Sequence, residues 1–218
     1  MLHQTITVLD YDDTLLPSSY LKASGALTGL SSPSLTAELQ AIDELVLSIL
    51  RSAVQYGPVY VLSAADVPWI EATADCYLPR VASLLRKDAS NCIKVISARE
   101  WYFAAHGIIG TPERWKNEAF QWLYKTENSQ SKCSKTLLSI GDSDVEHHAA
   151  RKVVSCVKTV KFIAAPSTQD LYEQLRTLQT VFHEIILHDG PLDLLLASDT
   201  KSPVKRRTFQ PYRVDEKV

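Results

Sequence analysis

Residues 6–16 read Ile-Thr-Val-Leu-Asp-Tyr-Asp-Asp-Thr-Leu-Leu, an apolar run that stops at three carboxylates. The aliphatic and β-branched residues 6–9 predict a short buried strand, so Asp10 and Asp12 stand at its carboxyl end. In parallel α/β sheets, ligands bind at that end. Carboxylates so close together repel one another unless a cation or a substrate offsets their charge. The stretch therefore predicts a bound divalent metal and suggests a carboxylate nucleophile.

Composition indicates an ordinary globular protein with enough residues for one domain and a full core. The chain has 218 residues, 45% of them hydrophobic and 22% charged, with a net charge of −2. The chain lacks the excess of basic residues that is typical of nucleic-acid-binding proteins. No segment approaches the ~20 apolar residues of a membrane span. The four cysteines lack metal-binding spacing, and no secretory signal precedes them. We therefore expect reduced thiols in a cytoplasmic protein that binds neither nucleic acid nor membrane.

Short apolar runs alternate with segments of helical periodicity along most of the chain. The predicted strands span residues 6–9, 59–62, 94–96, 136–140 and 157–163. The predicted helices span residues 33–55, 67–78, 80–85, a segment around Trp101, a segment that starts at Pro112, and residues 147–153 and 168–187. Ser32 and Asp66 are predicted helix caps, and residues 17–34 read as an irregular loop or flap. This order predicts a three-layer α/β/α, Rossmann-like parallel sheet.

The domain is expected to occupy residues 1–196. From Ala197 the apolar pattern fades, and residues 197–218 read as a disordered, charged tail with a basic stretch at 201–207. A solvated tail is the default interpretation, and docking to an acidic partner or regulatory phosphorylation is the alternative.

Polar residues suited to one task follow several of the predicted strands or begin a helix. Asp10 and Asp12 follow the first strand, Ser63 ends the second, Lys116 lies in the first turns of a helix, and Asp142 follows a later strand. Together they supply carboxylates for a metal, a hydroxyl and an ammonium for a phosphate, and a nucleophile.

At this point the chain resembles the haloacid dehalogenase superfamily. Residues 10–15, Asp-Tyr-Asp-Asp-Thr-Leu, match its first motif, Asp-x-Asp-x-Thr-Leu. Ser63 after an apolar strand matches the second motif, Lys116 the third, and Gly141-Asp142 after residues 137–140 the fourth. The match covers roughly residues 5 to 165, and its strength lies in the order of all four motifs.

The resemblance implies an Mg²⁺-dependent phosphate-monoester hydrolase and assigns roles to these residues. Asp10 would attack phosphorus and form an aspartyl-phosphate, and Asp12 would act as general acid and base. The resemblance places Mg²⁺ on Asp10, Asp142 and the backbone carbonyl of Asp12. Ser63 and Lys116 would hold the phosphoryl oxygens. An acid at the position of Asp12 is typical of the phosphatases of the superfamily. Asp13 falls at a variable position and is expected to face away from the chemistry.

The fourth motif of the superfamily usually has a second acid a few residues after the first. Here the candidates are Asp144 and Glu146. Glu146 fits the longer spacing with Glu in place of Asp, and Asp144 fits a shorter variant. We favour Glu146, as a residue behind the ligands that orients metal-bound water.

Neither interval between the motifs has room for a large cap domain. Between Thr14 and Ser63 there are 48 residues, and between Ser63 and Lys116 there are 52. Predicted helices and a strand use most of both, although residues 17–34 could hold a small helical cap. An open site favours a large phosphorylated substrate such as a phosphoprotein, or a homo-oligomer whose neighbour covers the site.

A narrower resemblance links the chain to a group of uncharacterised members of the superfamily from eukaryotic microbes and algae. It is carried by Trp-Ile-Glu at 69–71, Tyr-Leu-Pro at 77–79, Ile-Ser-Ala-Arg at 96–99, Trp-Lys at 115–116 and Gly-Asp-Ser at 141–143. It implies no substrate. Two rival functions stay open: a phosphotransferase or phosphomutase that uses the same aspartate, and a non-catalytic binding or scaffold module.

Other conspicuous residues have plainer interpretations. His147 and His148 are adjacent, so on a helix their side chains point about 100° apart and would not share an ion. Arg99 is expected in a structural ion pair. The four tryptophans are expected to pack between helices or in the core, with Trp69 and Trp101 close enough to strand ends to line the site.

Overall fold

The computed structural model describes residues 4–28, 32–86, 93–129, 135–196 and 204–206. In this part of the chain a seven-stranded sheet has the order β3-β2-β1-β4-β5-β6-β7, in which β7 alone is antiparallel to its neighbour. The strands are β1 Thr5–Leu9, β2 Val59–Ser63, β3 Ile93–Ser97, β4 Thr136–Gly141, β5 Val157–Lys161, β6 Leu192–Leu196 and β7 Val204–Arg206.

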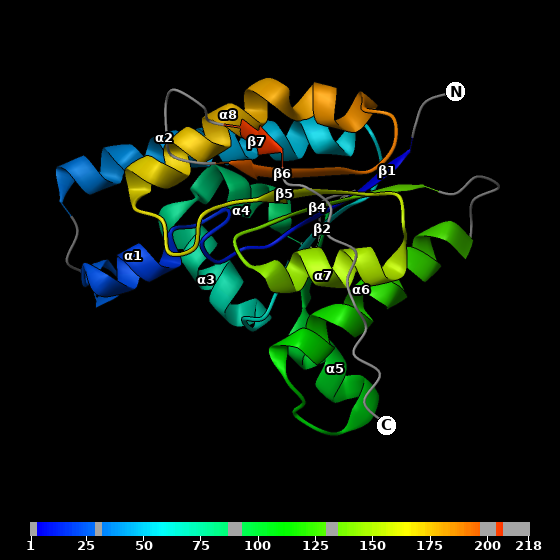
Figure 1. Ribbon diagram of the computed structural model, residues 1–218. Coiled ribbons are helices and arrows are strands. Elements are labelled where there is room, and N and C mark those ends of the chain that lie inside the picture. Colours follow the sequence, from blue (N-terminus) through cyan, green and yellow to red (C-terminus); the bar gives the residue numbers. More distant parts are fainter. Residues whose placement is uncertain (1–3, 29–31, 87–92, 130–134, 197–203, 207–218) are drawn as a thin grey trace.

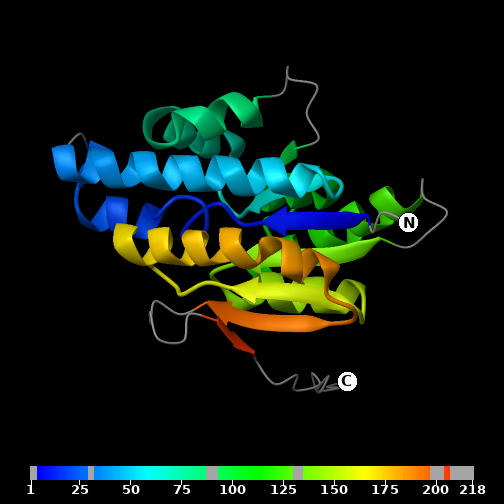
Figure 2. The same ribbon diagram turned by 90° about the horizontal axis from the view of Figure 1, so that it is seen from above.

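Helices cover both faces of the sheet (Figure 1). They are α1 Ser18–Ala23, the 3₁₀ helix η1 Ala26–Thr28, α2 Pro33–Val54, α3 Val67–Tyr77, α4 Pro79–Leu85, α5 Ala98–His106, α6 Pro112–Ser129, α7 Asp144–Val153 and α8 Thr168–Leu187. Helices α2 and α8 lie side by side on one face (Figure 2), whereas α5, α6 and α7 cover the other. The predicted three-layer α/β/α, Rossmann-like fold is confirmed. Within the described residues, neither interval between the motifs forms a separate cap domain.

The two helical layers bury opposite faces of the same strands. In β1, Ile6 and Val8 pack into the cluster beneath α6 and α7, whereas Leu9 packs into the cluster beneath α2 and α8. In β2, Tyr60 packs into the cluster beneath α6 and α7, and Val61 packs into the cluster beneath α2 and α8. Side chains alternate across a strand, so a strand covered on both faces reads as a continuous apolar run. These runs made the central strands predictable.

The predicted helix caps are also confirmed. The Ser32 side chain accepts a hydrogen bond from the backbone N–H of Leu35 at 3.2 Å, and Asp66 accepts one from Trp69 at 3.0 Å. Each cap precedes a proline in the first helical turn, where its missing N–H costs nothing.

The segment predicted as irregular, residues 17–34, is partly helical, which corrects that prediction. It holds α1 and η1, and Leu21 and Ala26 are buried in the core beneath α2. The side chain of Asp13 accepts hydrogen bonds from the backbone N–H of Ser19 at 2.9 Å and from its hydroxyl at 2.5 Å. A carboxylate outside the segment therefore supplies the helix cap that the local sequence lacks.

Two further predictions need correction at the ends of elements. Strand β6 was not predicted, and the expected disorder of residues 197–218 is wrong for Val204–Arg206, which pairs with β6. The remainder of that tail lies outside the described residues. The spacing of Trp115, Ala119, Trp122 and Leu123 predicts that these residues share the inner face of α6. Instead the buried residues are Lys116, Ala119, Phe120 and Leu123, and Trp122 is 38% exposed and packs against Trp101.

In the part of the chain that the structure describes, no helix is both long and apolar enough to cross a membrane. Cys76 and Cys156 carry free, exposed thiols. Cys92 and Cys133 lie outside the described residues.

Candidate active site

The candidate site lies where the strand order changes direction. From β1 the chain moves outward to β2 and β3, then returns to the other side of β1 to form β4 and β5. Open α/β sheets bind ligands in the crevice outside the carboxyl ends of the strands at such a switch point. Asp10 follows β1, Ser63 ends β2 and Asp142 follows β4. The backbone N–H of Asp10 donates to the carbonyl of Ile140 at 2.9 Å, which fixes the two strand ends together.

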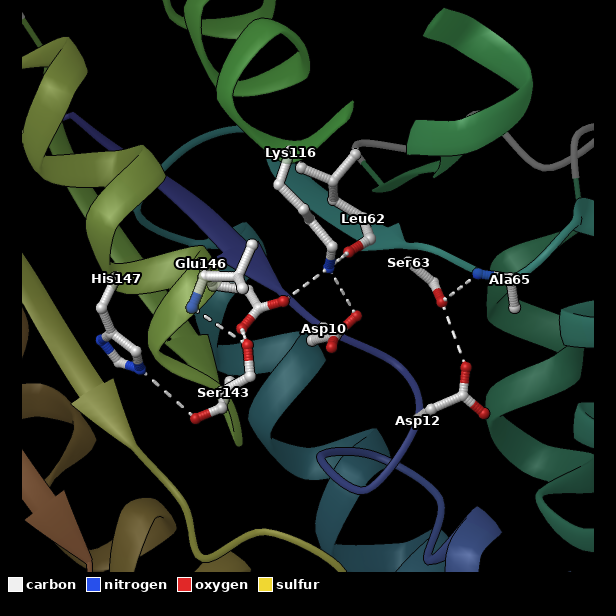
Figure 3. Close-up of polar contacts among 11 residues, drawn as sticks. Asp10, Asp12, Leu62, Ser63, Ala65, Lys116, Ser143, Glu146 and His147 are labelled. Atoms are coloured by element: carbon white, nitrogen blue, oxygen red, sulfur yellow. Dashed lines mark hydrogen bonds and ion pairs between the residues drawn. The ribbon is translucent and has the colours of Figure 1, made fainter. Parts of the chain in front are cut away.

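Lys116 is the buried centre of this site. Its side chain is 2% exposed, and its Nζ lies 2.8 Å from Asp10 Oδ1, 2.6 Å from the Leu62 carbonyl and 3.0 Å from Glu146 Oε1 (Figure 3). An ammonium has three N–H donors, and these three acceptors match them. The predicted helical position of Lys116 is confirmed by α6, whose second turn brings the side chain beneath the end of β2. Its predicted contact with a substrate phosphate stays a prediction.

Three carboxylates gather beside this ammonium. One oxygen each from Asp10, Asp142 and Glu146 lies within 4.8 Å of the other two. The sequence left Asp144 and Glu146 open as the second acid of the fourth motif. The structure brings Glu146 into the cluster, whereas Asp144 is half-exposed and pairs with Lys161 at 3.3 Å.

Charge is unevenly balanced in the cluster. Burial raises the pKa of Asp10 to about 7, although Lys116 acts in the opposite direction. Burial, together with the charges of Glu146 and Asp13, raises the pKa of Asp142 to about 6. Burial opposes ionisation of Glu146 as well, but the charge of Lys116 and the hydrogen bonds that Glu146 accepts together outweigh it and lower the pKa of that carboxyl. Burial also opposes the charge of Lys116, yet the carboxylates hold its pKa above the ordinary value.

One ammonium therefore faces three carboxylates, and the set can hold a further cation. All the donor atoms are carboxylate oxygens, the ligands that hard divalent cations such as Mg²⁺ prefer. The chemistry of the donor set thus fits the metal that the sequence predicts.

The start of α7 positions Glu146. The Ser143 side chain caps the helix by accepting from the N–H of Val145 at 3.1 Å, and its hydroxyl donates to Glu146 Oε2 at 2.5 Å. A Cβ at Gly141 would lie 3.2 Å from the Glu146 Cγ, so the glycine leaves room for this side chain. Ser-x-x-Glu is a sequence signature of a helix start, which is why Glu146 points back toward the strand ends.

Asp12 lies apart from the carboxylate cluster, on the side of β2 and α3. Its Oδ2 accepts a hydrogen bond from the Ser63 hydroxyl at 3.2 Å, and its Oδ1 accepts one from the indole N–H of Trp69 at 3.1 Å. The Ser63 oxygen also accepts the N–H of Ala65 at 3.0 Å (Figure 3). The structure thus brings together Asp12 and Ser63 as one group, and Asp10, Lys116 and the other acids as a second. The expected metal contact of the Asp12 carbonyl stays a prediction.

Sequence reasoning missed the site contact of Lys161, and it raised Trp69 as a residue that could line the site without predicting its contact with Asp12. Lys161 is the last residue of β5, and its Nζ donates to the Asp142 carbonyl at 3.0 Å. Its position at the carboxyl edge, one strand beyond β4, was a usable signal. Trp69 stands three residues after the Asp66 cap, which places its indole at the same edge. Asp13 is buried against Ser19 and serves the fold.

The histidines and Arg99 fit their plainer interpretations. His147 is buried with Nε2 3.4 Å from the Gly141 carbonyl, and burial lowers the pKa of its imidazole to about 4. His148 is exposed on α7, and neither histidine belongs to the carboxylate cluster. Arg99 forms the expected ion pair, with Asp66 at 3.1 Å.

Comparison of the chain with protein-family models, with curated proteins and with solved structures finds no match. The resemblance to the haloacid dehalogenase superfamily therefore rests on the four motifs and stays a hypothesis.

Proposed function

We propose that this chain is an Mg²⁺-dependent phosphate-monoester hydrolase that works through an aspartyl-phosphate on Asp10, as in the haloacid dehalogenase superfamily. The observation that carries the proposal is the buried group of Asp10, Asp142 and Glu146 around Lys116 at the switch point of the sheet. Two carboxylates paired with one ammonium, and a third carboxylate within 4.8 Å of both, favour a bound cation. Asp12, held by the Ser63 hydroxyl on the side of β2, supplies a second acid suited to proton transfer.

Asp10, Asp142 and the backbone carbonyl of Asp12 would hold the metal, and Glu146, in the same cluster of acids, would orient metal-bound water. When bound, Mg²⁺ would neutralise charge on the phosphoryl oxygens and polarise the phosphorus toward attack. Lys116 holds one oxygen of Asp10, which leaves the other oxygen to attack. Cationic and hydroxyl groups that stabilise developing charge supply most of the catalysis in phosphoryl transfer.

The chain's own residues account for both halves of the reaction. In the first, an Asp10 oxygen forms a bond to phosphorus as the ester P–O bond breaks, and Asp12 gives a proton to the leaving oxygen. In the second, Asp12 takes a proton from a water molecule as that water attacks phosphorus and the bond to Asp10 breaks. Covalent catalysis thus splits one difficult hydrolysis into two easier steps.

A site without a separate cap domain in the described residues suits a large phosphorylated substrate such as a phosphoprotein, or a homo-oligomer in which a neighbouring chain covers the site. Both are predictions, as are the cytoplasmic location and the absence of nucleic-acid and membrane binding.

Asp10→Asn tests the nucleophile. We expect turnover of an aryl phosphate to fall to the assay background while the circular dichroism spectrum is unchanged, because the amide keeps the shape and loses the nucleophilic charge. Asp75→Asn, an exposed aspartate on α3, is the matched control and should keep full turnover. An active Asp10→Asn protein would exclude the aspartyl-phosphate mechanism.

Metal removal tests the cofactor. EDTA should abolish turnover, and added Mg²⁺ should restore it; turnover that persists in EDTA excludes this metal site. Transfer of phosphate to a sugar hydroxyl in place of water would favour a phosphomutase. A protein that is inactive on a broad panel of phosphate esters, yet captures a specific partner, would favour a scaffold module.

A further inference from the structure

Asp12 is held by two groups whose hydrogen-bonding chemistry differs. Its Oδ1 faces the indole N–H of Trp69 at 3.1 Å, and its Oδ2 faces the Ser63 hydroxyl at 3.2 Å. We propose that Trp69 is a positioning residue that determines which oxygen of Asp12 exchanges protons with the substrate. This inference rests on the proposed hydrolase and deepens it.

Hydrogen bonds and packing hold Trp69 in place at the start of α3. Its backbone N–H donates to the cap residue Asp66 at 3.0 Å, and its carbonyl accepts from the Thr73 hydroxyl at 2.7 Å. Its ring packs against the core beneath α2. The Tyr11 hydroxyl, one residue before Asp12, lies 2.9 Å from the Thr73 hydroxyl. Two neighbouring residues of the loop after β1 are therefore fastened to the same side of α3, so the indole has a fixed place relative to Asp12.

The two oxygens of Asp12 differ in whether their hydrogen-bond partner allows them to bind a proton. An indole N–H can only donate, whereas a hydroxyl can both donate and accept. The Oδ1 lone pair that faces Trp69 is therefore occupied and cannot carry a proton there. Oδ2 faces a hydroxyl that can donate to a carboxylate or accept from a carboxylic acid. Of the two contacts that hold Asp12, only the one at Oδ2 is thus compatible with a bound proton.

The proton balance follows from this assignment. In the first half-reaction the Oδ2 proton of Asp12 passes to the leaving oxygen as the ester P–O bond breaks. In the second half-reaction Oδ2 receives a proton from the attacking water as the bond between phosphorus and Asp10 breaks, which restores the starting state. In both half-reactions the indole N–H of Trp69 continues to donate its hydrogen bond to Asp12 Oδ1. Ser63 is free to turn its single O–H toward a phosphoryl oxygen, because its oxygen is still held by the Ala65 N–H.

Trp69→Phe tests this role because it keeps an aromatic ring and removes the N–H donor. A general acid matters most when the leaving group is a poor one, so two esters are compared: an alkyl phosphate and a p-nitrophenyl phosphate. For the alkyl ester we expect kcat to fall about tenfold or more, with KM changed less than about twofold. For the aryl ester kcat should fall by less than about threefold. Trp122→Phe, on α6, is the matched control and should change neither ester.

A second measurement needs no turnover and leaves Trp69 unchanged. The indole ¹H–¹⁵N signal of Trp69 is assigned by its loss in Trp69→Phe, or by mutation of the other three tryptophans if that variant does not fold. In metal-free Asp12→Ala we expect this signal to shift, as the hydrogen bond is lost, while the other three indole signals stay in place.

Equal losses of kcat on the two esters would reduce Trp69 to a structural residue and overturn the inference while leaving the hydrolase intact. An indole signal that Asp12→Ala does not move would overturn it as well. If the wild-type protein hydrolyses no ester, the proposed function fails and the proton-transfer role fails with it, whereas a shifted indole signal would still establish the contact between Trp69 and Asp12.

Discussion

Lys116 shows how much of this site depends on a single charge. Within the described residues, the ion pairs of Asp10 and of Glu146 are both made with its Nζ. The lysine is buried, so water does not replace it when it is removed. A buried ion pair adds little net stability compared with an apolar pair, but loss of one partner leaves an uncompensated buried charge. Lys116 therefore has a structural role that is separable from any contact with substrate.

We expect Lys116→Met, which keeps most of the apolar stem, to lower the free energy of unfolding by about 3–5 kcal/mol at about pH 8 in EDTA. Urea denaturation followed by circular dichroism measures this loss. Lys125→Met, on the exposed face of the same helix, should change it by no more than about 0.5 kcal/mol. Equal stability of the two variants would mean that the buried carboxylates do not need the ammonium.

The elements that the sequence failed to predict share one physical cause: distant contacts hold them in place. Helix α1 has six residues and no cap of its own, and Asp13 supplies the missing acceptor. Strand β7 has three residues at an antiparallel edge, too few to show a period. By contrast, α2 and α8 have 22 and 20 residues, and their apolar spacing predicted them to within about two residues at each end. A long helix can be recognised from the apolar periodicity of its own sequence, whereas a short element is stabilised by tertiary contacts that its local sequence does not show.

Asp43 gives a test of such a distant contact. It is buried in α2, and its two carboxylate oxygens accept the backbone N–H groups of Arg80 and Val81, both at 3.0 Å. Helix α4 follows Leu78, which offers no side-chain cap. We expect Asp43→Ala to lower the free energy of unfolding by about 1–3 kcal/mol, because two helix N–H groups lose their acceptors.

Urea denaturation of Asp43→Ala beside its neighbour Glu44→Ala provides the comparison. Glu44 makes an exposed ion pair with Arg80, so its loss should cost less than about 1 kcal/mol. Asp43→Asn should fall between the two, since an amide oxygen still accepts one hydrogen bond. If Asp43→Ala is no more destabilising than Glu44→Ala, the long-range cap contributes nothing to α4.

For the whole molecule, parallel strands explain why part of the site was predictable. Their carboxyl ends meet at one edge, so Asp10, Ser63 and Asp142 come together once the strand order is known. Motif spacing favoured Glu146 over Asp144, but the position of the Glu146 carboxylate beside Asp10 and the contact of Trp69 with Asp12 could not be derived from the sequence. Both depend on the directions in which side chains leave a capped helix start, which are set by packing between elements.

The carboxylate cluster should also govern how stability depends on pH. The pKa of Asp10, about 7, and that of Asp142, about 6, lie above the ordinary value of 3.8. Between the ordinary pKa and the raised pKa of each carboxyl, the folded protein binds more protons than the unfolded chain. The contribution of the two protonated carboxyls to stability is therefore complete at low pH and is lost as pH rises toward 7. His147, whose pKa is lowered to about 4, acts in the opposite direction between about pH 4 and 6.5.

Comparison with Asp10→Asn removes the contribution of His147, which is common to both proteins, and reports on Asp10 together with the charged groups that interact with it. In EDTA we expect the stability of the wild type relative to Asp10→Asn to fall between about pH 5 and pH 8, by at most about 1.4 kcal/mol per pH unit. With Mg²⁺ the trend should reverse, since the metal binds ionised carboxylates and stabilises the folded protein more at pH 8 than at pH 5. Thermal unfolding in the two buffers measures both effects. A difference between the proteins that is independent of pH in EDTA would show that Asp10 is ionised throughout, and the negative charge of the cluster would then need no metal to offset it.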